Sequence, residues 1–185
     1  MRPFPPTLLL ATLLCGCQLW VMPPRSARPL AAPLSEHHQV ARLLTIDWNG
    51  HRQSLRCRLI TGPGETRMEA LSDTGLAVLR LTQSPTRIEI ERSPRLPPSI
   101  SPDVLLADIQ LVFWPADSLE RTLVAPWRLT RHAGGRRLYE GDTLRARVDY
   151  QGPDRWRGVA TLHNTRYGYR LTLTPVIDSA GETAP

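Results

Sequence analysis

Cys17 is the residue of this sequence whose chemistry its surroundings define most clearly. It closes the run Leu14-Cys15-Gly16-Cys17, which follows the basic residue Arg2 and the apolar stretch 8–14. A basic start, an apolar stretch and a small residue at the cut together make up a secretory signal peptide. A cysteine directly after the cut offers a thiol that can accept a diacylglycerol group. We therefore predict a lipoprotein signal peptide over residues 1–16 and acylation of Cys17.

A transmembrane helix and an ordinary secretory signal fit this N-terminal segment less well. A transmembrane helix needs about 20 apolar residues, and the apolar run from Thr7 to Leu14 is far shorter. An ordinary secretory signal would be cleaved at another position. Of the two cysteines, Cys15 cannot be the acylated residue, because the bulky Leu14 would then stand directly before the cleavage site. Each buried methylene contributes roughly 0.8 kcal/mol, so a multiply acylated Cys17 would attach the chain firmly to a membrane.

Asp108 is the other side chain with candidate chemistry, because it is an acid inside an otherwise apolar segment that is predicted to be helical. It could serve binding or gating, or it could pair with an arginine or a backbone donor, since a buried carboxylate needs such a partner. Cys57 alternates with leucines on either side, which favours a small buried side chain. Once Cys15 is removed and Cys17 is acylated, Cys57 has no partner for an intramolecular disulfide.

No motif indicates an enzyme, a metal site or a cofactor. The five histidines lie apart in the sequence, without the spacing of metal ligands. The chain contains no G-x-S-x-G elbow, no P-loop and no glycine-rich dinucleotide turn. Its 23 basic residues are all arginine and are dispersed rather than clustered, so we expect no nucleic-acid binding. We expect neither catalysis nor a cofactor, and an unrecognised hydrolase stays open as an alternative.

The chain divides into a short tether, one folded domain and a tail. Residues 17–39 hold four prolines with serine and alanine between them, a composition that favours an extended tether. Residues 40–177 make up a single β-rich domain, long enough to bury a real core. Residues 178–185 are small and polar, so we predict a disordered tail there.

Alternation of apolar and polar residues dominates the predicted domain. Such strands bury one face and expose the other, which is typical of antiparallel sheet. Turn signals rich in glycine and asparagine separate the candidate strands. The clearest alternating segments are residues 55–59, 87–91, 143–150 and 167–174.

One segment follows helical rather than strand spacing. Residues 101–103 provide a cap, a proline at the first helical position and an acid in the first turn. Pro115 ends this helix, and Asp117 followed three residues later by Glu120 resembles the capping box of a second, shorter helix. We therefore predict a mainly β fold with a helical pair, a curved antiparallel half-barrel whose concave face carries a helical lid or plug.

A concave face lined by the apolar half of each strand would accept an apolar ligand or an acyl chain. Phe113 and Trp114 would either roof such a cavity or simply fill the core. The candidates for the cavity and its cover are Leu105, Ile109, Val112, Phe113, Trp114, Tyr150 and Tyr169.

Several segments between residues 40 and 175 resemble a family of small uncharacterised Gram-negative lipoproteins. They are the run from Leu105 to Leu111 leading to Trp114-Pro115, the preceding Leu96-Pro97-Pro98, then Arg137-Leu138-Tyr139 and the stretch from Asn164 to Leu173. Genes of that family often lie in clusters for aryl polyenes and related fatty-acid-like lipids. The architecture is more distantly similar to the lipoprotein carriers LolA and LolB, open β-barrels with a helical lid over a hydrophobic cavity.

The resemblance implies a carrier at a membrane. Gln18 follows the acylated cysteine, and in Gram-negative lipoproteins a residue other than aspartate there implies the outer membrane. We expect a monomer on the inner leaflet, facing the periplasm, that binds or hands over a lipidic ligand alongside lipoprotein or polyene-lipid pathway proteins. Leu76 is the nearest candidate for the exposed leucine of LolB, or else it begins a strand. The alternative is a non-catalytic assembly or interaction lipoprotein with a filled core.

Overall fold

The computed structural model describes residues 28–96, 101–152 and 154–176. The predicted signal peptide (1–16), Cys17, the first part of the predicted tether and the predicted tail (178–185) lie outside these ranges. Acylation of Cys17 therefore stays a prediction.

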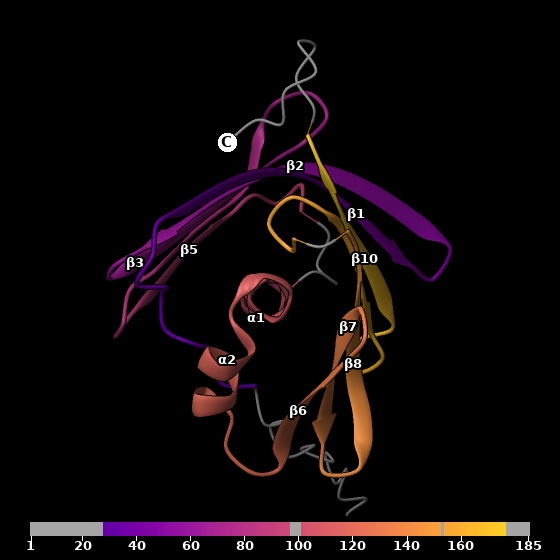
Figure 1. Cartoon of the computed structure of the whole chain (residues 1–185). Helices are drawn as coiled ribbons and strands as arrows, with labels where there is room; N and C mark the ends of the chain where they lie inside the picture. Colours follow the sequence, from indigo (N-terminus) through magenta and orange to yellow (C-terminus); the bar gives the residue numbers. More distant parts are fainter. Residues whose placement is uncertain (1–27, 97–100, 153, 177–185) are drawn as a thin grey trace, which may run out of the picture.

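The described residues form ten strands of one antiparallel sheet, which curves into an unclosed arch (Figure 1). The strand order is β5-β4-β3-β2-β1-β10-β9-β8-β7-β6, so β1 and β10 meet in the middle and β5 and β6 form the two edges. The strands are β1 (His38–Trp48), β2 (His51–Gly62), β3 (Glu65–Leu71), β4 (Ala77–Gln83), β5 (Ile88–Arg92), β6 (Trp127–His132), β7 (Gly135–Glu140), β8 (Thr143–Gln151), β9 (Val159–Asn164) and β10 (Tyr169–Pro175). The prediction of a mainly β, curved antiparallel fold with a helical pair is confirmed.

Alternation along each strand decides which face of the sheet becomes the core. Leu55, Cys57 and Leu59 of β2 are buried, and the arginines between them are exposed, as predicted. Directly opposed residues in an antiparallel ladder point to the same face. Leu44 of β1 therefore packs beside Leu55, and Met68 of β3 packs beside Leu59.

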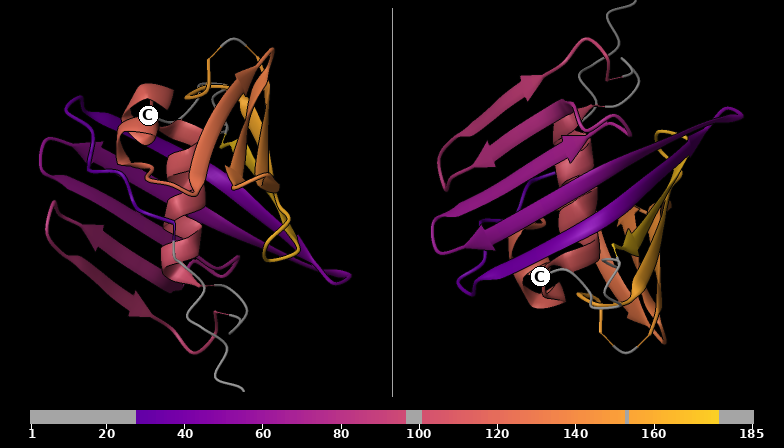
Figure 2. Two further views of the ribbon diagram at one scale, coloured as in Figure 1. Left: turned by 90° about the horizontal axis from the view of Figure 1, so that it is seen from below. Right: turned by 90° about the horizontal axis from the view of Figure 1, so that it is seen from above.

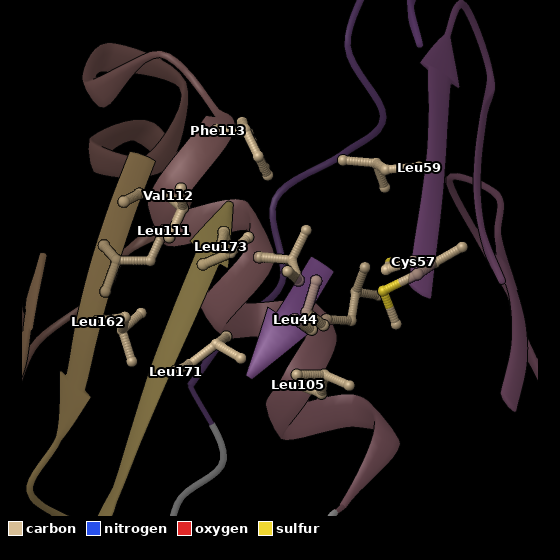
Figure 3. Packing of buried hydrophobic residues seen from close by; sticks show 14 of the residues in the cluster. Leu44, Cys57, Leu59, Leu105, Leu111, Val112, Phe113, Leu162, Leu171 and Leu173 are labelled. Atoms are coloured by element: carbon tan, nitrogen blue, oxygen red, sulfur yellow. The ribbon is translucent and has the colours of Figure 1, made fainter. Parts of the chain in front are cut away.

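Two helices, α1 (Pro102–Phe113) and α2 (Ala116–Thr122), join β5 to β6. Seen from the open side of the sheet, α1 lies in the gap between the two edge strands (Figure 2). Ten of its 12 residues are buried, so α1 fills the concave face as a plug. Side chains of α1 such as Leu105 and Val112 lie among leucines of β1, β9 and β10 (Figure 3). Burial on all sides, rather than helix propensity, holds α1 in place.

The predicted capping box at the start of α2 is wrong. Pro115 occupies the cap position and makes no side-chain hydrogen bond there. Asp117 and Glu120 instead both form ion pairs with Arg131 of the neighbouring strand β6. The capping-box rule considers only residues within one helical turn, so it does not take into account a basic side chain that strand β6 brings close to these carboxylates.

Residues 30–34, which we call the strap, cross α1 on the open side of the sheet (Figure 2). The Ala31 N–H donates to Gln110 Oε1 at 2.9 Å, and the Ala31 carbonyl accepts from Gln83 Nε2 at 2.8 Å and from Gln110 Nε2 at 2.9 Å. Trp114 Nε1 donates to the carbonyl of Ala32 at 2.8 Å. Buried side-chain amides and indoles need such partners, and the extended strap supplies them.

The strap moves the start of the folded domain towards the N-terminus. The composition of residues 17–39 predicts a tether, but Ala31 is only 2% exposed and Leu34 only 8% exposed. Strand β1 then begins at His38. A proline-containing composition predicts extended backbone, but it does not reveal whether that backbone packs against a core.

Gly135, the first residue of β7, is a position where a side chain does not fit. A Cβ atom there would lie 2.1 Å from the backbone oxygen of Val148 on β8. Because a backbone atom cannot yield without disturbing the ladder, we expect Gly135→Ala to lower the free energy of unfolding by about 3 kcal/mol in urea titrations. Gly134→Ala meets no atom within 4 Å but has a φ of +78°, and it should cost only about 1 kcal/mol. Equal losses for the two variants would contradict this packing.

Candidate functional site

A pocket of about 450 Å³ opens beside α1, in the gap between the two edge strands of the sheet. We call it the α1 pocket. Its apolar wall consists of Leu30, Ile88, Val104, Ala107, Trp127, Leu138 and Ala146. These residues come from the strap, both edge strands, α1, β7 and β8, so only the folded chain brings them together. Ligand sites in proteins commonly measure about 300–1,000 Å³ and have mostly apolar walls with a few polar groups.

Asp108 is the centre of a polar cluster on one wall of the α1 pocket. Its Oδ2 accepts hydrogen bonds from Asn164 Nδ2 at 2.7 Å and from the Tyr169 hydroxyl, and its Oδ1 lies 3.3 Å from Arg28 Nη2. The Asp108 side chain is only 1% exposed. Burial raises the pKa of Tyr169 well above its usual value, and the Asp108 carboxylate raises it further, so the tyrosine stays a donor at neutral pH.

A second charged cluster borders the same pocket. Arg145 Nε and Arg166 Nη1 lie 2.9 Å and 3.1 Å from the same oxygen, Oε2 of Glu140. The Arg166 guanidinium also lies 5.6 Å from the ring centroid of Trp127. Two guanidinium groups thus lie beside one carboxylate at this side of the pocket, and Asp108 pairs with Arg28 on another wall. A guanidinium group such as that of Arg145, which is 33% exposed, can pair with an anionic group at the end of an apolar ligand.

Residues 39–177 match the model of a family described as "Protein of unknown function (DUF3261)". The chain belongs to this family. The expected membership of an uncharacterised family is thereby confirmed. The match covers the sheet from Gln39 onward, both helices and every described residue that borders the α1 pocket except Arg28 and Leu30. Comparison with curated proteins finds no match.

In the DUF3261 domain, five of the predicted cavity residues lie in the packed core. Each of them is at most 1% exposed: Leu105, Ile109, Val112, Phe113 and Trp114. Leu105, Val112 and Phe113 lie among side chains of the sheet (Figure 3). None of the five is among the described residues that line the α1 pocket. Of the two alternatives for Phe113 and Trp114, the structure places both in the core.

The two predicted tyrosines hold α1 through their hydroxyl groups and do not line the α1 pocket. Tyr150 Oη donates to the carbonyl of Val112 at 2.7 Å, and the Tyr169 hydroxyl donates to Asp108. Of the predicted site residues, only Asp108 borders the α1 pocket within the described part of the chain. Asp108 is paired, as one of the two alternatives expects, and its role in binding or gating stays a prediction.

Several residues of the pocket were not predicted from the sequence. They are arginines and aromatic residues from distant segments, namely Arg28, Trp127, Arg145, Arg166 and Tyr167. Tyr167 was expected within an alternating strand, but β10 begins at Tyr169 and Tyr167 lies in the turn before it. No local spacing connects these positions, so no pattern in the sequence could have indicated them.

Cys57 is a buried, unreactive thiol, as its alternation predicts. It is 5% exposed, and burial raises the pKa of Cys57 to about 12 from a usual value of 9. Since only the thiolate is nucleophilic, we expect no alkylation by iodoacetamide at about pH 8 in the folded Cys17→Ala chain and full alkylation in urea.

The free energy of unfolding should fall as the pH rises from 9 towards 12, because the Cys57 thiol ionises at a lower pH in the unfolded chain than in the folded chain. Rapid alkylation of folded protein would contradict this burial.

Neither a membrane-spanning helix nor a metal cluster occurs in the part of the chain that the structure describes. Among residues 28–96, 101–152 and 154–176, no helix has the length and apolar character needed to cross a bilayer. The same residues contain no cluster of three or more histidine, cysteine, aspartate or glutamate side chains that could hold a metal ion.

Proposed function

We propose that the DUF3261 domain binds the chain of a fatty-acid-like or other lipidic ligand in the α1 pocket. In this proposal acylated Cys17 holds the domain on the inner leaflet of the outer membrane, facing the periplasm, where the ligand is received or handed over. The observation that carries the proposal is the amphipathic lining of the pocket. An apolar wall of seven side chains stands beside Arg145 and Arg166, which share one carboxylate.

The likeness to LolA and LolB belongs to this proposal. An unclosed, curved antiparallel sheet with a helix on its concave face is the architecture that the resemblance implies, and the strand order supports it. Leu76 lies in the turn before β4 and is 48% exposed. Its exposure leaves a LolB-like contact of Leu76 with the membrane as the alternative to the membrane contact proposed below.

A second candidate function has an observation of its own. The plug formed by α1 fills most of the concave face, which favours a non-catalytic assembly or interaction lipoprotein over a carrier with a large cavity. The two candidates differ in what occupies the α1 pocket, because a carrier binds lipid there and an interaction protein does not need to. A hydrolase is the least supported candidate: Ser101 and Asp103 border the pocket, but its described lining contains no histidine.

Mass spectrometry of co-purified lipid tests the proposal. The chain from residue 17 onward with Cys17→Ala would be purified without strong detergent, and its bound lipid extracted and identified. We expect a single-chain acid or related amphiphile in a fixed ratio to the protein. A folded preparation, shown by cooperative unfolding, that contains no lipid would overturn carriage and leave the interaction lipoprotein.

A further inference from the structure

Three large apolar side chains are exposed at the mouth of the α1 pocket or next to it on β5. Ile88 is 39% exposed, Ile90 is 43% exposed and Tyr167 is 46% exposed. Ile88 and Tyr167 line the pocket directly. Ile90 pairs with Leu81, which is 1% exposed, so Ile90 points to the concave face of the sheet.

The position of β5 explains why its isoleucines are exposed. β5 is an edge strand, and every one of its residues is exposed, including the two isoleucines on the face that forms the core elsewhere. Its glutamates point to the convex face, where Glu91 lies 3.6 Å from Arg80. An apolar rim around a pocket is a common mark of an interaction surface.

The attachment point of the chain lies at the same mouth. The strap is fixed to α1 through Gln110 and Trp114, and Arg28, just before it, lines the α1 pocket. Arg28 follows Cys17 by eleven residues, a distance of at most about 40 Å even when fully extended. A lipid anchor that joins the domain at the mouth of the pocket limits how far that side can move from the membrane, and so favours an orientation with the mouth towards the bilayer.

Charge at the mouth fits a lipid surface. Arg28, Arg145 and Arg166 contribute guanidinium groups to the pocket, beside Asp103 and Asp108. Arg28 and Arg166 are mostly buried in ion pairs, whereas the side chain of Arg145 is 33% exposed. Anionic phospholipid headgroups attract such groups. Arginines beside exposed isoleucine and tyrosine side chains together favour a bilayer surface as the partner.

We propose that the open side of the sheet, from β5 to the mouth of the α1 pocket, rests on the surface of the membrane. Ile88, Ile90 and Tyr167 would enter the headgroup region, and Arg145, the most exposed of the three arginines, would contact lipid phosphates. This inference rests on the proposed acylation of Cys17, and it does not depend on what fills the pocket. Its consequence is that a lipid could pass between bilayer and pocket without crossing water.

Spin labels on the full acylated chain test this orientation. Ile90→Cys, Leu43→Cys and Leu76→Cys would each be labelled with a nitroxide, in vesicles of phosphatidylethanolamine and phosphatidylglycerol. Leu43 is a matched control, since it is 38% exposed and lies on the opposite, convex face of the sheet. We expect the label at position 90 to be accessible to oxygen and shielded from a water-soluble nickel complex, and the other two labels to remain in water.

The outcomes separate this inference from the proposed function. A label at position 90 that is as water-exposed as the one at position 43, or a label at position 76 that enters the bilayer instead, overturns the orientation even if lipid co-purifies. A shielded label at position 90 supports it even if no lipid is found. In addition, Ile90→Asp should weaken binding of the Cys17→Ala chain to the same vesicles by about tenfold, whereas Leu43→Asp should leave it unchanged.

Discussion

Asp108→Ala is expected to lower the free energy of unfolding by about 4 kcal/mol, because removal of one partner leaves a buried charge uncompensated. The guanidinium of Arg28 would lose its carboxylate, and Asn164 and Tyr169 would lose the acceptor they share. Urea unfolding followed by circular dichroism measures the loss. The Asp108 carboxylate is thus expected to stabilise the fold whether or not it also contacts a ligand.

A matched pair of variants isolates the buried cluster. Asp103 also borders the α1 pocket, but it is exposed and accepts a hydrogen bond from the nearby Ser101. Asp103→Ala should cost less than about 1 kcal/mol. Asp108→Asn keeps one acceptor oxygen and should fall between the two alanine variants. A loss for Asp108→Ala no larger than that for Asp103→Ala would refute the buried cluster as a stabilising unit.

Ala107→Phe is expected to weaken binding of a fluorescent fatty acid by at least about tenfold, because the new ring occupies the space that the ligand needs. Ala107 lies on α1 and borders the α1 pocket, which offers about 450 Å³ to receive the ring. The fold should therefore tolerate the change, with little loss of unfolding free energy. Fluorescence titration of the Cys17→Ala chain measures the affinity.

Ala133→Phe is the matched control for this substitution. Ala133 is exposed in the turn between β6 and β7, and it does not belong to the described lining of the α1 pocket. Its replacement should leave the affinity unchanged. If Ala107→Phe binds the fatty acid as tightly as the control does, the ligand lies elsewhere on the domain.

Local patterns predicted the strands and the limits of α1 well. Alternation at Leu55, Cys57 and Leu59 depends only on neighbours two residues away, and the proline at each end of α1 acts within one turn. The pairing of β1 with β10 depends on strands more than 100 residues apart, so no local pattern indicates it. The strap was missed for the same reason, since its partners Gln83 and Gln110 lie far along the chain.

The candidate site could be predicted only in part. Asp108 stood out because an acid in an apolar helix needs partners, and the structure supplies three of them. The leucine and aromatic candidates of α1 belong to the core because the helix fills the concave face of the sheet. Helical periodicity identifies the side of a helix that points inward, but it does not show whether a cavity lies beside that side. Arg28 and Arg166 meet at one pocket although 138 residues separate them, and that meeting is a property of the fold.

Photo-crosslinking locates the ligand most directly. Palmitic acid that carries a diazirine would be added to the folded Cys17→Ala chain, activated with light and mapped by peptide mass spectrometry. Binding in the α1 pocket predicts crosslinks concentrated in residues 101–108 and 138–146, with little labelling of Ala107→Phe. Crosslinks confined to the convex face of β1 and β2, or labelling of Ala107→Phe equal to that of the unsubstituted pocket, would contradict a lipid site beside α1.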